Sequence, residues 1–202
     1  MFDQYDLDKV AKALFSVRTS EKPEYERLLI RAGKRAVKPL LRAVIFVTVR
    51  QKDKTENLAR SGQRSVFGES ETRYMWAKIT LEPIIDEAVK IIQKLGSSGT
   101  HELCATLLDA DHKIRLATAL ILCKGNFVNG EILEATQDAI YHIGPDKKQG
   151  ATVMLLGIMM VNNGDHKWRD VLEDFARKEG VSFERCVEKT INTGLIELQK
   201  YK

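Results

Sequence analysis

Turn-forming residues recur along this chain at a nearly constant spacing, and the spacing limits what the chain can fold into. The turns centre near residues 34, 72, 110, 145 and 180, at intervals of 38, 38, 35 and 35 residues. The turn near 72 is placed by interpolation across a stretch with weak periodicity. Intervals of this length accommodate a pair of helices with its connections. Gly and Pro together supply only 17 of 202 residues, too few for the many tight turns of a sandwich or barrel.

The segments between these turns carry the apolar spacing of amphipathic helices. The clearest stripe is Val37, Leu40, Leu41, Val44 and Ile45. The β-branched run 44–49 resembles a strand when taken alone, but the stripe leading into it favours a helix. Other predicted helices cover 7–17, 20–33, 71–95, 101–108, 114–124, 130–142, 147–161, 166–178 and 182–201, the third of them continuous or kinked near Pro83. No strand pair is found, so the predicted fold class is all-α.

Two of the turns carry more specific residues. Residues 107–120, LLDADHKIRLATAL, resemble the HEAT repeat, in which leucines end one helix, Asp makes the turn and Ile-Arg opens the next helix. Residues 32–41, AGKRAVKPLL, are similar to another form of that turn. The resemblance implies a right-handed α-α superhelix, a HEAT/armadillo-like solenoid of about five helical hairpins, spanning 1–202 as one domain. It also implies that Arg115 pairs with a turn aspartate, Asp109 or Asp111.

Positive charge is concentrated in one segment. The net charge of the chain is +4, yet residues 31–64 hold ten basic and two acidic residues, which leaves −4 for the rest. Arg35, Lys38 and Arg42 share one helical face away from the apolar stripe. In a HEAT-like array the second helices line the concave side, so this face would border a groove. The candidate polyanion-binding residues are Lys34, Arg35, Lys38, Arg42, Arg50, Arg60 and Arg64, the last two on a polar, basic connection at about 51–70.

These features predict a binding or scaffold protein rather than an enzyme. A basic face binds phosphates or acidic side chains, so nucleic acid and an acidic protein both remain open as partners. Alternatively, the face that carries Arg35, Lys38 and Arg42 is an ordinary solvated helix surface. A second hypothesis is a resemblance to the DNA-alkylation-repeat glycosylases, which would require Trp76, or Trp168 with Asp170, to converge on the concave face. A third hypothesis is a structural subunit of a larger assembly.

Other site classes have weak support in the sequence. His101, Cys104, His112 and Cys123 do not follow a zinc-ligand spacing, and no nucleotide-binding glycine motif occurs. We therefore expect no catalytic residue, metal ion or small-molecule cofactor. The longest apolar run, 151–161, is about half of the ~20 residues that span a bilayer, and the acidic start is unlike a signal peptide. The short apolar runs predict no membrane partner, and three scattered cysteines indicate a reduced, cytoplasmic setting.

Overall fold

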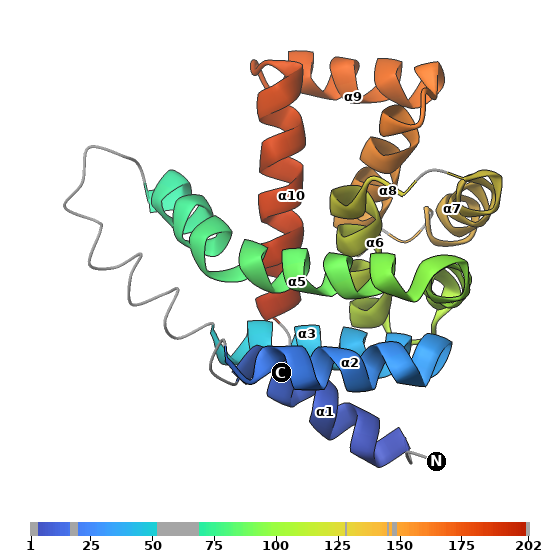
Figure 1. The fold of residues 1–202 in the computed structure, drawn as a ribbon. Coiled ribbons are helices and arrows are strands. Elements are labelled where there is room, and N and C mark those ends of the chain that lie inside the picture. Colours follow the sequence, from blue (N-terminus) through green and yellow to red (C-terminus); the bar gives the residue numbers. More distant parts are fainter. Residues whose placement is uncertain are drawn as a thin grey trace.

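Helices joined by short turns form the whole described part of the chain. The structure is a computed structural model that describes residues 4–16, 20–51, 69–127, 129–144, 146 and 149–200 (Figure 1). No strand occurs among these residues, so the all-α prediction is confirmed. The elements are α1 (Gln4–Ser16), α2 (Lys22–Ala32), the 3₁₀ helix η1 (Gly33–Ala36), α3 (Val37–Arg50), α5 (Glu69–Ala105), the 3₁₀ helix η3 (Thr106–Leu108), α6 (His112–Gly125), α7 (Gly130–Ile143), α8 (Gly150–Asn162), α9 (His166–Lys178) and α10 (Phe183–Gln199).

Four of these helices begin at a side-chain cap. Asp111, Asn129, Asp165 and Ser182 accept hydrogen bonds from backbone N–H groups in the first turns of α6, α7, α9 and α10. Such caps satisfy donors that have no partner within the helix. The local sequence therefore sets where these helices start.

Two glycines interrupt the helical backbone in the same way. Gly33 has φ 61° and ψ −142°, and Gly96 has φ 64° and ψ −151°. Side-chain-bearing residues rarely adopt this region, so glycine is required at both positions. Gly33 ends α2 ahead of η1, and Gly96 divides α5 into a long part and a short part.

The sequence predictions for individual turns have different outcomes. Turns near 34, 110, 145 and 180 lie between described helices, as predicted. The predicted turn near residue 72 is wrong, because the backbone from Glu69 onward is already helical. The helix also continues through Pro83, and its break falls at Gly96. The β-branched run 44–49 belongs to α3. Residues 52–68 of the polar connection lie outside the described residues.

Helix α3 is surrounded by other helices. Leu40, Leu41 and Val44 are fully buried, and α1, α5, α6 and α10 all pack against α3. The C-terminal helix α10 runs from α9 back to the level of α3 (Figure 1). There the Gln199 side-chain amide donates a hydrogen bond of 3.3 Å to the Thr48 carbonyl oxygen. In a linear stack each repeat contacts only its neighbours, so this return of α10 to α3 differs from such a stack.

Replacing Gly96 by Ala should destabilise the protein by about 1–3 kcal/mol, because Ala is strained in this backbone region. No atom lies within 4 Å of the added Cβ, so the cost arises from the backbone alone. Gly130→Ala is the matched control, since Gly130 is helical and equally open. We expect this control to be neutral or stabilising. Equal urea midpoints for Gly96→Ala and the wild type would contradict the argument.

Candidate nucleic-acid interface

One strip of α3 remains at the surface, and the predicted basic residues lie along it. Lys38, Arg42, Phe46 and Arg50 follow one another at every fourth position, and we call this set the α3 row. The side chains of Lys38 and Arg42 are 42% and 44% exposed. The remaining faces of α3 are taken up by contacts with α5, α6 and α10. Packing therefore leaves the α3 row as the surface that this helix can offer to a partner.

Helix α1 lies beside the α3 row and contributes to it. The guanidinium of Arg42 lies 3.5 Å from the Asp8 carboxylate of α1. One turn further along both helices, the Lys12 ammonium lies 4.7 Å from the centre of the Phe46 ring. Because residues 8 and 12 face 42 and 46 in the same order, the two helices run side by side in the same direction. We call the surface along this junction the α1–α3 seam.

Phe46 is the aromatic member of the seam. Its side chain is 38% exposed, and the guanidinium carbon of Arg50 lies 4.9 Å from the ring centre. Cations interact favourably with the face of an aromatic ring, by about 0.5–1 kcal/mol at exposed sites. The sequence prediction missed Phe46, although its four-residue spacing from Arg42 and Arg50 could have revealed it. No sequence pattern indicated Lys12, because α1 reaches the seam only through tertiary packing.

A cavity opens at the other end of the seam. Its volume is about 350 Å³, and Leu7, Lys34, Arg35, Lys38 and Glu102 line it. Three of the predicted cations are thus brought to one cavity, together with one acidic side chain. Lys34 and Arg35 come from η1, so the Gly33 break places them there.

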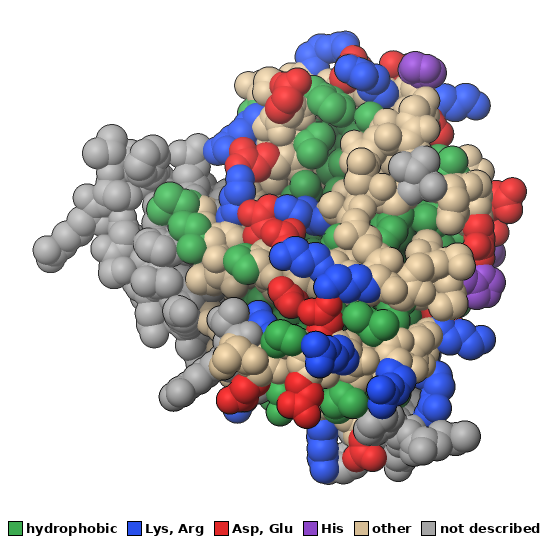
Figure 2. All heavy atoms as spheres, viewed as in Figure 1, with side chains coloured by type: hydrophobic (Ala, Val, Ile, Leu, Met, Phe, Trp, Pro, Cys, Tyr) green, Lys and Arg blue, Asp and Glu red, His purple; other side chains and the backbone are tan. Residues whose placement is uncertain are grey.

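Acidic residues lie close to several of these cations. The Lys38 ammonium forms a 2.8 Å ion pair with Asp109, and Arg42 pairs with Asp8. Figure 2 likewise shows Lys and Arg side chains interspersed with Asp and Glu on the face that it displays. A polyanion must therefore compete with internal carboxylates at Lys38 and Arg42.

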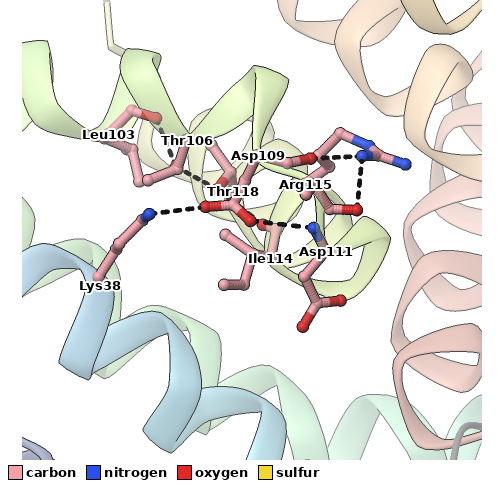
Figure 3. A network of polar contacts seen from close by, with 9 residues as sticks. Lys38, Leu103, Thr106, Asp109, Asp111, Ile114, Arg115 and Thr118 are labelled. Atoms are coloured by element: carbon pink, nitrogen blue, oxygen red, sulfur yellow. Dashed lines mark hydrogen bonds and ion pairs between the residues drawn. The ribbon is translucent and has the colours of Figure 1, made fainter.

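Asp109 joins the α2–α3 and α5–α6 hairpins (Figure 3). One carboxylate oxygen pairs with Lys38, and the other accepts a 2.9 Å hydrogen bond from the Asp111 backbone N–H. Partial burial acts to raise the pKa of Asp109, but the hydrogen bonds from Lys38 and Asp111 outweigh it, and the pKa is lowered. Beneath the turn, the Thr106 and Thr118 hydroxyls lie 2.7 Å apart and tie η3 to α6.

The structural role predicted for Arg115 is present, but its acceptors differ from the prediction. The Arg115 guanidinium donates to the backbone carbonyls of Asp109 and Ala110, the latter at 3.3 Å. Arg115 therefore contacts the turn residue Asp109 as predicted, but through the backbone carbonyl, and its charge helps to lower the pKa of the Asp109 carboxylate. The carboxylate of Asp109 is instead held by Lys38, from the neighbouring hairpin.

The remaining candidate residues do not join the seam. Arg60 and Arg64 lie outside the described residues, as does the side chain of Trp76. The Trp168 ring packs against Gly157 between α9 and α8, at the end of the molecule opposite α3 (Figure 1). For Trp168, the convergence that the glycosylase hypothesis requires is therefore not met.

The described cysteines are buried thiols. Burial raises the pKa of Cys104 to about 11 and that of Cys123 to about 12, and it also raises the pKa of Cys186. All three remain protonated at neutral pH, which makes them poor nucleophiles and metal ligands. Among the described residues, no three His, Cys, Asp or Glu side chains are grouped to hold a metal ion.

Comparisons of the chain with family models, curated proteins and solved structures find no match. Every helix in the described ranges is too short or too polar to cross a membrane.

Replacing Arg115 by Ala should destabilise the protein by about 1–3 kcal/mol, because two turn carbonyls lose a charged donor. Urea denaturation measures the change. Arg177→Ala is the control, since the Arg177 pair with Asp174 is highly exposed and its loss should change stability by about 0.5 kcal/mol or less. If both variants unfold at the wild-type midpoint, Arg115 does not stabilise the turn.

Asp109→Asn should lower stability at pH 7 by about 1 kcal/mol, since it removes the charge that pairs with Lys38. The folded-state pKa of Asp109 is lowered, so its contribution is present above the unfolded pKa and is lost as the pH falls through the folded value. The difference from wild type should therefore vanish in acid. Urea midpoints measured in steps from pH 7 down to about pH 2 follow it, and a difference that stays the same over this whole range would contradict the pairing.

Proposed function

We propose that this protein binds single-stranded nucleic acid along the α1–α3 seam as a non-enzymatic binding module. The observation that carries the proposal is the exposed Phe46 ring between Lys12 and Arg50, in line with further cations. Proteins that bind single strands combine a positive surface with aromatic side chains on which bases stack. An acidic protein would use the same charges but has no specific need for the ring.

The energies favour a base at Phe46 over the internal contacts. Each exposed cation–π contact contributes about 0.5–1 kcal/mol, whereas stacking of one base contributes about 1–3 kcal/mol. A base can therefore displace Lys12 or Arg50 from the ring at a net gain. The displaced side chain is long and positively charged, so it becomes available to the adjacent phosphate.

The cavity at the other end of the seam supplies the phosphate contacts. Lys34, Arg35 and Lys38 line it together with Glu102, so its lining carries a net positive charge. Phe46 follows the cavity residue Lys38 by eight positions on α3, so at 1.5 Å per residue the ring and the cavity lie about 12 Å apart along the seam. A strand that follows the seam would pass several phosphates over these cations.

The internal carboxylates limit the affinity that we expect. Lys38 and Arg42 are already paired with Asp109 and Asp8, so exchanging a carboxylate for a phosphate there yields little net gain. Lys12, Lys34 and Arg50 are further cations of the seam. With about −0.7 per phosphate contact for single strands, the slope of log affinity against log salt should lie near −2 to −3.

We also propose that the α2–α3 and α5–α6 hairpins are HEAT-like repeats of a solenoid that α10 closes at its C-terminal end. The HEAT-like residues 32–41 and 107–120 lie at the turns of these hairpins. The Lys38–Asp109 ion pair links the two units side by side, in support of this view. Three free cysteines favour a reducing, cytoplasmic setting.

The test is fluorescence anisotropy with a labelled oligothymidylate, an RNA of equal length, a DNA duplex and a polyglutamate peptide. Phe46→Ala should weaken binding of the single strands about fivefold to 150-fold, from the loss of about 1–3 kcal/mol of stacking. The same substitution should leave the binding of polyglutamate unchanged. Phe175→Ala is the control, because Phe175 is similarly exposed but lies on α9 at the opposite end of the molecule.

A charge reversal separates the seam from the net charge of the protein. Lys34→Glu with Arg50→Glu should abolish binding, whereas Lys167→Glu with Lys178→Glu makes the same change in charge on α9 and should retain it. Lys38 and Arg42 are left intact because Glu at either position would face Asp109 or Asp8. Absence of single-strand binding at low salt would overturn the proposal. If polyglutamate binds where the single strands do not, and the reversal abolishes that binding, the partner is instead an acidic protein.

A further inference from the structure

A second cavity lies within the arch formed by α8, α9 and α10, far from the α1–α3 seam (Figure 1). Its volume is about 420 Å³. Figure 2 shows hydrophobic side chains at the surface between α8 and α10, beneath α9. We call this cavity the arch cleft. Its size falls within the range of small-molecule sites, which are mostly apolar cavities with a few polar groups.

Small residues on two helices leave this space unfilled. On α10 the wall is built from Cys186, Thr190 and Thr193, and on α8 it begins with Gly150 and Ala151. The Thr190 hydroxyl donates to the Cys186 carbonyl at 2.9 Å, and the Thr193 hydroxyl donates to the Lys189 carbonyl at 2.8 Å. The donors of this wall are therefore satisfied within the helix, which makes the wall suited to an apolar group.

Larger apolar side chains complete the lining. Met154 comes from α8, Phe175 from α9 and Val181 from the turn before α10. Phe175 is 43% exposed, which is unusual for an aromatic side chain that borders a cavity. A hydrocarbon chain in the cleft would cover part of this ring.

The charged members of the lining differ in their partners. Arg185 pairs with Glu188 at 2.7 Å, and Glu188 also accepts from Lys78 at 2.9 Å. Glu179 is the acidic member of the lining. Lys189 also borders the cleft, and within the described part of the chain it forms no ion pair. The lining holds two cations and one carboxylate, so an anionic ligand at Lys189 reduces its net positive charge.

We propose that the arch cleft binds a small amphipathic monoanion, with a hydrocarbon tail and one carboxylate, as in a medium-chain fatty acid. The tail lies against Met154, Phe175 and Val181, and the carboxylate pairs with the Lys189 ammonium. A neutral alcohol of the same length retains the tail contacts but has no charge for Lys189. A cationic amphiphile meets repulsion from Lys189 and Arg185.

The cleft itself is tested by filling it. Titration of the full chain with decanoate, followed by isothermal calorimetry and by backbone amide NMR shifts, should give saturable binding with shifts at residues of α8 and α10 that line the cleft. Gly150→Phe should reduce binding at least tenfold, because Gly150 lines the cleft and has open space around its Cβ position. Gly130→Phe is the matched control, as Gly130 is also the open first residue of a helix. We expect this variant to bind as the wild type does.

The charge is tested at Lys189. Lys189→Met should weaken decanoate binding about tenfold, as expected for the loss of a charge-assisted contact, and should leave decanol binding unchanged. Lys178→Met removes the same charge from α9 outside the cleft and should have no effect. The proposal is overturned if decanoate does not saturate, if Gly150→Phe binds as tightly as Gly130→Phe, or if Lys189→Met affects decanoate and decanol equally.

Discussion

The burial of α3 is the constraint on which the arrangement of the other helices depends. Leu40, Leu41 and Val44 are fully buried, and burial of each such side chain stabilises the fold by about 1.5–3 kcal/mol. The ion pairs of Lys38 and Arg42 are partly exposed and contribute about 0–1 kcal/mol each. Apolar packing therefore fixes α1, α5, α6 and α10 around α3, and the ion pairs adjust to that packing.

The same packing decides the chemistry of the α1–α3 seam. With α1 in place, Asp8 faces Arg42 and Lys12 faces Phe46. Helix α1 therefore supplies a carboxylate that competes with an anionic ligand for Arg42, and it also supplies an additional cation. Asp109 acts similarly on Lys38 from the neighbouring hairpin. The segment 31–64 is strongly basic as a sequence, but in the fold Asp8 and Asp109 from distant segments pair with Arg42 and Lys38 in its described part. The proposed binding of nucleic acid therefore rests on Phe46 together with Lys12, Lys34 and Arg50.

At the opposite end of the molecule, glycines allow close contacts between α8, α9 and α10. Gly157 lets the Trp168 ring of α9 lie directly on α8, and Gly194 lets α10 approach Leu155 and Leu120. These close contacts fix the arch, while the small residues Cys186, Thr190 and Thr193 leave a cleft within it. The two candidate surfaces thus lie at separate ends of the fold and require different ligands.

The sequence by itself determined the helices, because a repeated apolar spacing and caps such as Asp111 are local and override the β-branched run 44–49. It also determined the turns near 34 and 110, since Gly33 and the Asp109–Asp111 turn are encoded within a few residues. The predicted turn near 72 was wrong because no local residue there breaks a helix. Tertiary structure alone decided that Lys38 pairs with Asp109, that Lys12 reaches Phe46 and that α10 returns to α3. Such contacts join residues far apart in the chain, and they depend on how apolar faces pack in three dimensions, which no local spacing encodes.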